Sequence, residues 1–428
     1  MHSPDANGES RRTFWLRVRE FAVPPSMIKA ATARRHAGDW AGACAAARVD
    51  VDLDLRALAR AGGATLSARI RADLRHLAPD LLRWHMPRIA PDGLLRPGLT
   101  VSLARYDGGV HLVARTPPAW ADAGQRVSLA VWGGSVRGGV PHPHPHPDQR
   151  FRLDLHRHLW DARRSGELRI RAGRGGVLAG APPGPDYAVD RWAAEAAILL
   201  HADGLPGTTV TVRLGAKRRL SVDAGGTVVP ARGRDPVLPD AATWVLPDVE
   251  LLRAGLLDAD RLHPLVAAAI APDRPPPDAA PPDDVDAPRA VACRGERHRI
   301  GLVDGVLVAL DHDPAEVRRE ELLAALGGTP LPCLQAIDEA HRRPECLTDV
   351  RARLDHGDAA GALAVVEGLL GADALLRHGA LREELETAAL RKVAHGLFRA
   401  GLAGDGPGPA HRDGRRVSRS RPRHASSR

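Results

Sequence analysis

The sequence predicts an α+β fold, built as an N-terminal helical segment, an antiparallel β-rich region, a Pro-rich linker, and a β-hairpin followed by a helical array. Helices are indicated by Leu66, Ile70 and Leu74, which recur along one helix face. Hairpins are indicated by apolar alternation on both sides of Asp107-Gly108-Gly109, because glycine accepts positive φ. The linker is residues 272–288, in which seven prolines and five aspartates exclude both a helix and a strand ladder.

Composition places the chain among globular proteins. It has 428 residues, of which 44% are hydrophobic and 26% are charged. These values exclude wholesale disorder and a collagen-like or membrane-bulk composition, and the length predicts two or three domains. Arginine supplies nearly all of the 60 basic residues, and Ala, Gly and Pro are abundant. That usage suggests a GC-rich bacterial genome.

The first two predicted segments are a flexible N-terminus over 1–25 and a helical segment over 26–98. Within the second, Ser26 is placed to cap the first helix and Asp39 to cap the next one. The hexapeptide around Asp39, GDWAGA, returns as GDAAGA at 357–362. In both copies glycine can end one helix and aspartate can cap the following one, so we expect the same helix junction twice.

A β-rich α+β domain is predicted over 99–271. Its first two strands flank Asp107-Gly108-Gly109. A helix over 190–202 interrupts the strands, and two short helices over 249–257 and 259–270 close the domain. Further strand candidates are 125–132, 151–155, 168–172 and 208–214.

After the linker, residues 289–405 are predicted to form a β-hairpin plus helical domain. Strands over 299–303 and 306–310 flank Asp304-Gly305, which is a strong hairpin turn signal. Asp313 then precedes Pro314, so we expect it to cap a helix that starts with proline at its first position. The remaining residues predict four or five helices separated by glycines.

The basic excess of the chain is concentrated in its C-terminal tail, residues 406–428, which we expect to be disordered. The formal net charge is +8, and residues 411–428 alone contribute +6 through seven arginines and one aspartate. The rest of the chain is therefore nearly neutral, unlike a folded nucleic-acid-binding domain. We expect nucleic acid to bind only weakly, through this tail.

Cysteine usage and hydropathy indicate the compartment. The chain has four cysteines and no CxxC pair, too few for a disulfide framework in a chain of this length. The N-terminus has no uncharged stretch typical of a signal peptide, and no apolar run reaches the length of a membrane span. We expect a cytoplasmic protein that does not bind membranes.

Cysteine and histidine residues of the C-terminal domain suggest a zinc site. The pattern Cys293-x4-His298 precedes the predicted hairpin, and His341-x4-Cys346 lies in the helical part, with Cys333 nearby. Two cysteines and two histidines are the donors of a tetrahedral zinc site. The spacings match no common zinc finger, so the alternative is that the thiols are buried structural residues and the histidines bind no metal. No other cofactor is predicted.

Asp311 and His312 are the candidate catalytic residues. They follow the second hairpin strand, and a carboxylate beside an imidazole can serve in general base catalysis. No recognised signature accompanies them: the sequence has no P-loop, no GxGxxG after a strand, no HExxH and no GxSxG motif.

The function favoured by these observations is binding to other proteins, as a regulatory or scaffolding component without assigned chemistry. Helical hairpins near both ends and a stiff linker that separates the modules support this prediction. The alternative is an enzyme with a site around the second hairpin, formed by Cys293, His298, Asp311 and His312 and assisted by a metal ion. A convergence of these side chains in the folded chain would favour that alternative.

Overall fold

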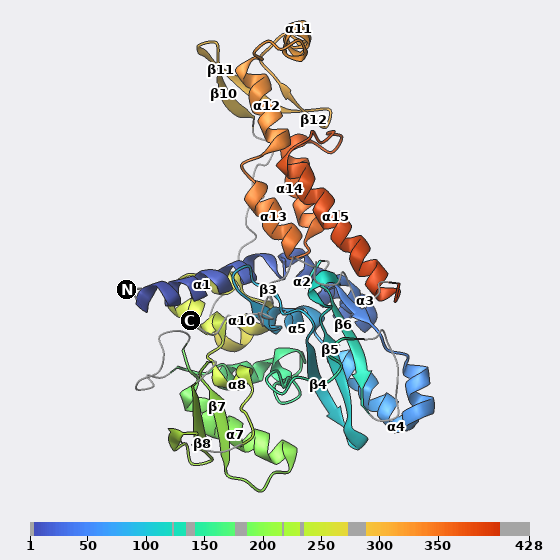
Figure 1. Cartoon of the computed structure of the whole chain (residues 1–428), viewed down its shortest axis with the longest axis vertical. Helices are drawn as coiled ribbons and strands as arrows, with labels where there is room; N and C mark the ends of the chain where they lie inside the picture. Colours follow the sequence, from blue (N-terminus) through green and yellow to red (C-terminus); the bar gives the residue numbers. More distant parts are fainter. Residues whose placement is uncertain are drawn as a thin grey trace, which may run out of the picture. The chain divides into compact units, whose positions relative to one another are not determined.

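The computed structural model describes residues 4–121, 124–133, 142–175, 186–215, 218–231, 235–272 and 288–402, with side chains from residue 11 onward. It confirms the α+β class (Figure 1). The chain divides into two compact units: unit 1 comprises residues 1–276 and 395–428, and unit 2 comprises residues 277–394. The boundary falls within the predicted linker, of which only Pro272 and Pro288 are described. The predicted basic tail lies outside the described residues.

Unit 1 begins with helices where we expected a flexible N-terminus. The first helix forms because Phe14 and Val18, one turn apart, are both buried in the core. Ser26 does not cap the second helix, because that helix starts one residue earlier, at Pro25, and Pro24 takes the cap position without a side-chain bond. Proline suits the first helical position since it needs no N–H partner there. The helices are α1 (Pro4–Phe21), α2 (Pro25–His36), α3 (Trp40–Ala46), α4 (Leu55–His76) and α5 (Pro79–His85).

The repeated hexapeptide makes the same helix junction in both units. Asp39 caps α3 by accepting a hydrogen bond from Gly42 N at 2.8 Å. Asp358 caps α14 (Ala359–Leu370) by accepting one from Gly361 N at 3.2 Å. The glycine before each cap has a left-handed φ, +76° and +81°, which ends the preceding helix. The predicted equivalence of the two copies is confirmed.

The main sheet of unit 1 has the strand order β1-β6-β5-β4. The last three form an antiparallel meander, and β1 pairs with β6 in parallel. The predicted turn Asp107-Gly108-Gly109 connects β4 to β5, and its two glycines have φ of +72° and +70°. The strands are β1 (Val49–Val51), β4 (Thr100–Tyr106), β5 (Val110–Arg115) and β6 (Val127–Trp132).

The remainder of unit 1 corrects two predicted strands. The strand over 208–214 is confirmed, but 168–172 is not a strand: Leu168 begins a helical turn, because a short apolar run does not distinguish strand from helix. Residues 151–155 form turns tied to the main sheet by one bridge between Arg152 and Ser102. The elements are β2 (Arg88–Ile89), β3 (Leu94–Leu95), α6 (Leu168–Arg171), α7 (Val189–Asp203), β7 (Thr209–Arg213), β8 (Arg219–Asp223), β9 (Val228–Pro230), α8 (Asp240–Thr243), α9 (Pro247–Arg253) and α10 (Pro264–Ile270).

Unit 2 combines a three-stranded antiparallel sheet with a helical array. The predicted hairpin is present, with Val303 paired with Val306 around Asp304-Gly305. An additional strand, β10, pairs with the hairpin, and α12 packs against all three strands. The elements are β10 (Arg289–Cys293), β11 (Glu296–Val303), β12 (Val306–Ala309), α11 (Pro314–Ala325), α12 (Pro332–Arg342), α13 (Leu347–Asp355), α14 and α15 (Ala380–Arg399), of which the residues from His395 belong to unit 1.

Across the described part of the chain, no helix combines the length and the apolar character that crossing a membrane requires.

Candidate metal centre

Two cysteines and two histidines of unit 2 converge. Cys293, His298, His312 and Cys333 each offer one ligand atom, and these four atoms all lie within 4.8 Å of one another. They come from the end of β10, the middle of β11, the loop after β12 and the first turn of α12. Among the described residues this is the only such group of His, Cys, Asp or Glu side chains.

The hairpin register places the first two ligands. Cys293 pairs with Glu296 across a two-residue turn, in which Arg294 and Gly295 have φ of +53° and +87°. Since side chains two residues apart on a strand point to the same face, His298 lies on the same face as Glu296 and therefore as Cys293. A short hairpin thus supplies one thiol and one imidazole.

The other two ligands lie at the two ends of the segment that contains α11. Beyond β12, Leu310 N donates to Arg299 O at 2.9 Å. This bond keeps the chain beside β11 and positions His312 near Cys293 and His298. Asp313 then caps α11 by accepting from Ala315 N at 2.7 Å. Cys333 is the second residue of α12 and is delivered by the packing of that helix on the sheet.

The distances suit a tetrahedral ion. His298 Nδ1 lies 2.7 Å from His312 Nε2, and Cys293 Sγ lies 3.6 Å from the same Nε2. In a tetrahedral zinc site with Zn–N near 2.0 Å and Zn–S near 2.3 Å, neighbouring ligand atoms are about 3.3–3.8 Å apart. The sulfur–nitrogen distance has this value, and the two imidazole nitrogens need to separate by less than about 1 Å.

Three of the four side chains in this group are buried. Cys293 and Cys333 are 1% and 0% exposed, and the His312 side chain is 3% exposed. Burial, together with the hydrogen bond to Cys293, raises the pKa of the Cys333 thiol to about 11. The thiol is therefore protonated at neutral pH by itself, and a bound cation would hold it as the thiolate.

Each histidine has a carboxylate beside its outer nitrogen. His298 Nε2 lies 3.5 Å from Glu296 Oε2, and His312 Nδ1 lies 3.5 Å from Glu316 Oε2. Glu316 is itself held by Arg294 at 2.8 Å. Carboxylates in this position orient a metal-bound imidazole and fix its tautomer.

The structure brings together three of the residues singled out in the sequence, Cys293, His298 and His312. The fourth member, Cys333, was noted only as a neighbour, because 20 residues that include α11 separate it from His312. No spacing rule covers such a gap. The contact between α12 and the sheet was the missing information.

The other candidates lie outside the cluster. His341 is buried further along α12, and Cys346 is half-buried at the N-cap of α13. Asp311 accepts hydrogen bonds from the Arg299 backbone N–H and from its guanidinium, both at 2.7 Å. These bonds lower the pKa of Asp311 to about 2, so this carboxylate is ionised and already engaged at neutral pH.

In comparisons with known proteins, no family model, no curated protein and no solved structure matches the chain.

Proposed function

We propose that the chain is a zinc-binding protein in which Cys293, His298, His312 and Cys333 hold one Zn²⁺ in a structural role. The convergence of four ligand atoms within 4.8 Å carries this proposal. Two thiolates and two imidazoles suit zinc, which prefers tetrahedral nitrogen and sulfur ligands. Four protein ligands leave no position for water or substrate, which argues for a structural ion. Catalysis around the second hairpin has less support because Asp311 is engaged by Arg299.

The proposed ion would fasten α11 to the sheet. This helix lies between His312 and Cys333 along the chain, and none of its side chains is buried. Its other attachments include ion pairs from Arg294 to Glu316 and Glu320, both at 2.8 Å. Since exposed ion pairs contribute little stability, an ion bound at both ends of this segment would supply most of the energy that fixes α11.

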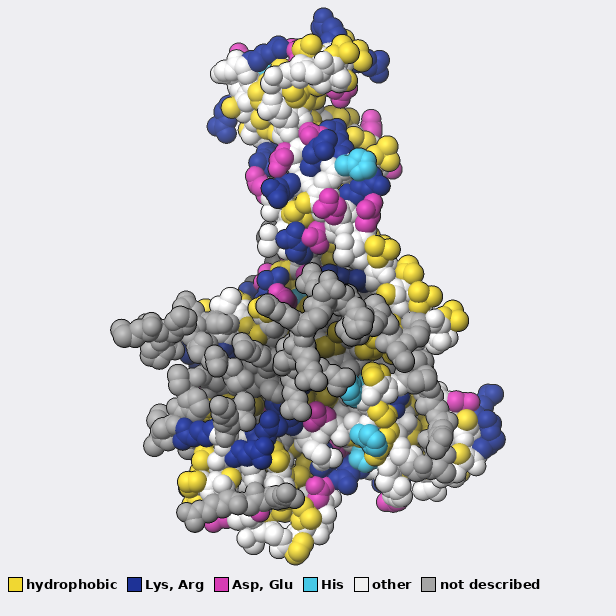
Figure 2. Space-filling view, viewed as in Figure 1, with side chains coloured by type: hydrophobic (Ala, Val, Ile, Leu, Met, Phe, Trp, Pro, Cys, Tyr) yellow, Lys and Arg dark blue, Asp and Glu magenta, His cyan; other side chains and the backbone are white. Residues whose placement is uncertain are grey.

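Fastened in this way, α11 forms one wall of a groove that we propose as the binding site of a protein partner. The groove has a volume of about 1310 Å³ and lies between β12, α11, α12 and residues 373–377. Pockets for small ligands measure about 300–1,000 Å³, so the larger size favours a peptide segment. Val317, Leu334 and Leu375 contribute apolar lining, and Figure 2 shows apolar side chains exposed at the end of the unit that carries α11, at the top of the view. A partner segment with apolar side chains would cover them.

All four cysteines are free. Free thiols and a zinc thiolate site both persist in a reducing compartment, which supports the proposal that the protein acts in the cytoplasm.

The zinc content of the purified full-length protein tests the metal assignment. We expect about one zinc per chain by mass spectrometric metal analysis after gel filtration. Cys333→Ser should lose the zinc, and Cys346→Ser, which alters a cysteine outside the cluster, should retain it. A wild-type chain without zinc, or equal zinc content in the two variants, would contradict the assignment.

A matched pair of surface variants tests the groove. Leu375 and Leu326 are both 87% exposed, but only Leu375 lines the groove. After cross-linking in the host, a partner that co-purifies with the wild type and with Leu326→Asp, but not with Leu375→Asp, supports the proposal. A partner set that Leu375→Asp leaves unchanged refutes the groove without affecting the zinc assignment.

A further inference from the structure

Strand β12 forms one edge of the sheet of unit 2. The strand order is β10-β11-β12, so β12 pairs only with β11 (Figure 1). Natural edge strands commonly carry a charged residue or a proline, which discourages pairing with another chain. The sequence of β12 is Val-Leu-Val-Ala, and among the described edge strands longer than two residues it is the only one with neither. Nothing in its sequence therefore opposes a further strand.

The hairpin register determines which backbone groups of β12 point outward. Leu310 N donates to Arg299 O at 2.9 Å, and in an antiparallel pair hydrogen-bonded residues alternate with residues that are not hydrogen-bonded across the pair. Every second residue counted back from Leu310 therefore bonds to β11, whereas the N–H and C=O groups of Leu307 and Ala309 point away from it. Among the described residues, no hydrogen bond to these four groups is present. The edge thus offers two donors and two acceptors to an extended chain.

The groove proposed above as the partner site runs along this edge. All four residues of β12 line it. Because successive side chains of a strand point to opposite faces, a pocket on one face of the sheet would be lined by alternate residues only. Leu334 and Ile337 of α12 and the exposed Leu375 also line the groove. A segment that lay along β12 would therefore pack apolar side chains against these three residues.

Charged residues of the groove specify the partner further. The described lining holds four carboxylates and three guanidinium groups. Asp338 pairs with Arg342 at 2.7 Å and with Arg377 at 2.6 Å. The carboxylates that form no ion pair with any described residue belong to Glu321, Glu339 and Asp373. A lysine or arginine in the partner segment would balance the one carboxylate in excess.

We propose that an extended segment of the partner protein pairs with β12 and adds a fourth strand to this sheet. Its backbone bonds to the outward groups of Leu307 and Ala309, its alternate apolar side chains enter the groove, and a basic residue lies beside them. This inference rests on the groove proposed above as a partner site, and it specifies the conformation and chemistry of the segment that the groove receives.

The first experiment uses the peptide Lys-Val-Thr-Val-Thr-Val-Lys as the probe, with fluorescein at one end, and measures its anisotropy with the zinc-loaded full-length protein. We expect saturable binding. Two modified peptides carry N-methyl groups on the valines or on the threonines. Because alternate N–H groups of a strand point to opposite edges, only one set faces β12. Only one modified peptide should therefore bind more weakly, by at least about tenfold.

If the two modified peptides bind alike, or if the unmodified peptide shows no saturable binding at millimolar concentration, strand pairing is wrong. The zinc content of the same sample and the cross-linking test of Leu375→Asp do not depend on this peptide. Failure of strand pairing would therefore leave the proposed zinc site and groove standing.

The second experiment changes the edge itself. Ala309→Pro removes one outward N–H group, at a kind of position where edge strands tolerate proline. It should retain zinc and weaken binding of the unmodified peptide about tenfold, whereas Ala309→Ser, which keeps the N–H group, should bind like the wild type. Equal binding by a zinc-loaded Ala309→Pro variant would contradict the proposal. If this variant loses zinc, the two modified peptides still decide with the wild-type chain.

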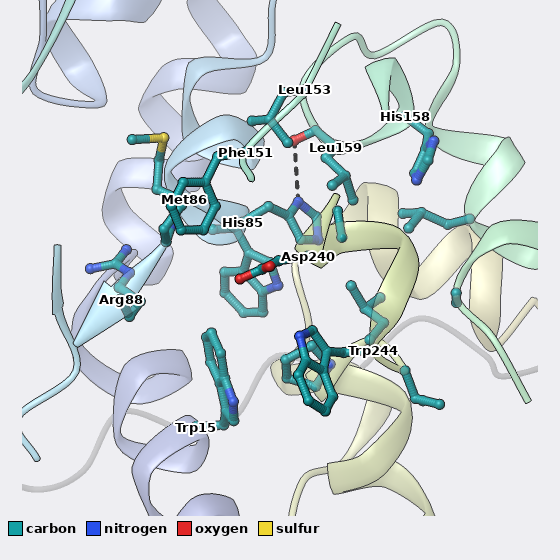
Figure 3. A pocket seen from close by; sticks show the side chains of 18 of the residues that line it. Trp15, His85, Met86, Arg88, Phe151, Leu153, His158, Leu159, Asp240 and Trp244 are labelled. Carbon is teal, nitrogen blue, oxygen red and sulfur yellow. Dashed lines mark hydrogen bonds between the residues drawn. The ribbon is translucent and has the colours of Figure 1, made fainter. Parts of the chain in front are cut away.

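The cavity of unit 1 is the alternative location for the peptide. Its volume is about 170 Å³, and Trp15, Trp84 and Trp244 line it; Figure 3 shows Trp15 and Trp244 beside this space. A cavity of this size accommodates a single ring and not a peptide of seven residues. All eight tryptophans precede residue 245, so unlabelled peptide bound at β12 should leave tryptophan emission unchanged. Saturable quenching would place the peptide in unit 1 and overturn the assignment to β12.

A second copy of the chain is the other occupant that the edge could take, because two β12 strands can pair with each other. Sedimentation velocity of the full-length protein separates the two cases. We expect the wild type and Ala309→Pro to have the same oligomeric state. A wild-type dimer that becomes a monomer in Ala309→Pro would assign the edge to self-pairing and overturn the assignment to a partner segment.

Discussion

The two units satisfy their buried polar side chains in different ways. In unit 1 buried charges have protein partners: Arg19 pairs with Asp248 at 2.7 Å, and their side chains are 1% and 0% exposed. Asp80 and His263 form a second buried pair at 3.1 Å. In unit 2 the buried thiols and half-buried histidines of the candidate metal site face mainly one another. Unit 1 therefore carries its own compensating charges, whereas in unit 2 the proposed zinc ion would supply the charge.

The largest expected effect is the response of unit 2 to chelation. Structural zinc contributes roughly 10–16 kcal/mol of apparent binding free energy at neutral pH, so its removal should unfold most of residues 288–394. All eight tryptophans precede residue 245, so their emission reports unit 1 alone. A strong zinc chelator should raise amide hydrogen exchange in unit 2 and leave tryptophan emission unchanged. The chelator saturated with zinc is the control. An equal increase in hydrogen exchange in both units would show that metal removal does not affect unit 2 specifically.

The next effect is the loss of a buried pair in unit 1. Asp248 accepts hydrogen bonds from both Arg19 and Trp84 Nε1. Asp248→Ala should lower the free energy of unfolding by about 3–5 kcal/mol, because it leaves the Arg19 charge buried and unpaired. Asp107→Ala removes an exposed pair with Arg69 and should change little. Urea denaturation followed by tryptophan emission measures both, and similar losses in the two variants would show that burial does not set the cost.

Only part of the fold and of the candidate site could be predicted from the sequence. Helix caps such as Asp39 and Asp313 and the turn Asp304-Gly305 were predictable, because neighbouring residues determine them. Helix α1 was missed because its stabilising contacts are remote: Arg19 and Asp248 are 229 residues apart. For the same reason, only part of the candidate metal site could be predicted from the sequence. Cys293 and His298 belong to one hairpin, whereas Cys333 joins them only through helix packing.

Acid should destabilise the two units by different mechanisms. Burial lowers the pKa of His85 from 6.5 to about 3 in the folded chain. Between these two pKa values the unfolded chain binds a proton at His85 and the folded chain does not. The free energy of unfolding of unit 1 should therefore decrease as the pH is lowered from 6.5 to about 3. His85→Gln should flatten this dependence in urea denaturation monitored by tryptophan emission. An unchanged slope in that variant would show that His85 is not the group responsible.

Unit 2 should lose stability over the acidic range for another reason, since protonation of the four proposed ligands would release the proposed zinc. Added zinc should therefore restore amide protection in unit 2 at moderately acidic pH and leave the pH profile of unit 1 unchanged. Restoration of both units would mean that the metal acts on the whole chain.

The smallest effects are expected from substitutions in the repeated hexapeptide, whose two copies provide an internal comparison. Asp39→Ala and Asp358→Ala each remove an equivalent cap, which is worth about 0.5–2 kcal/mol. The first should lower the stability reported by tryptophan emission, and the second should raise hydrogen exchange only in unit 2. If either substitution also changed the stability of the other unit, the two cores would not be independent.

The most direct test of the central claim is the visible spectrum of the full-length protein after zinc is exchanged for Co²⁺. Four ligands from Cys293, His298, His312 and Cys333 predict the intense bands of tetrahedral Co²⁺ together with thiolate charge-transfer absorption, at one ion per chain. Cys333→Ser should weaken both features, and Cys346→Ser should reproduce the wild-type spectrum. The weak spectrum of octahedral Co²⁺ in the wild type, or thiolate bands that persist in Cys333→Ser, would contradict the four-ligand site.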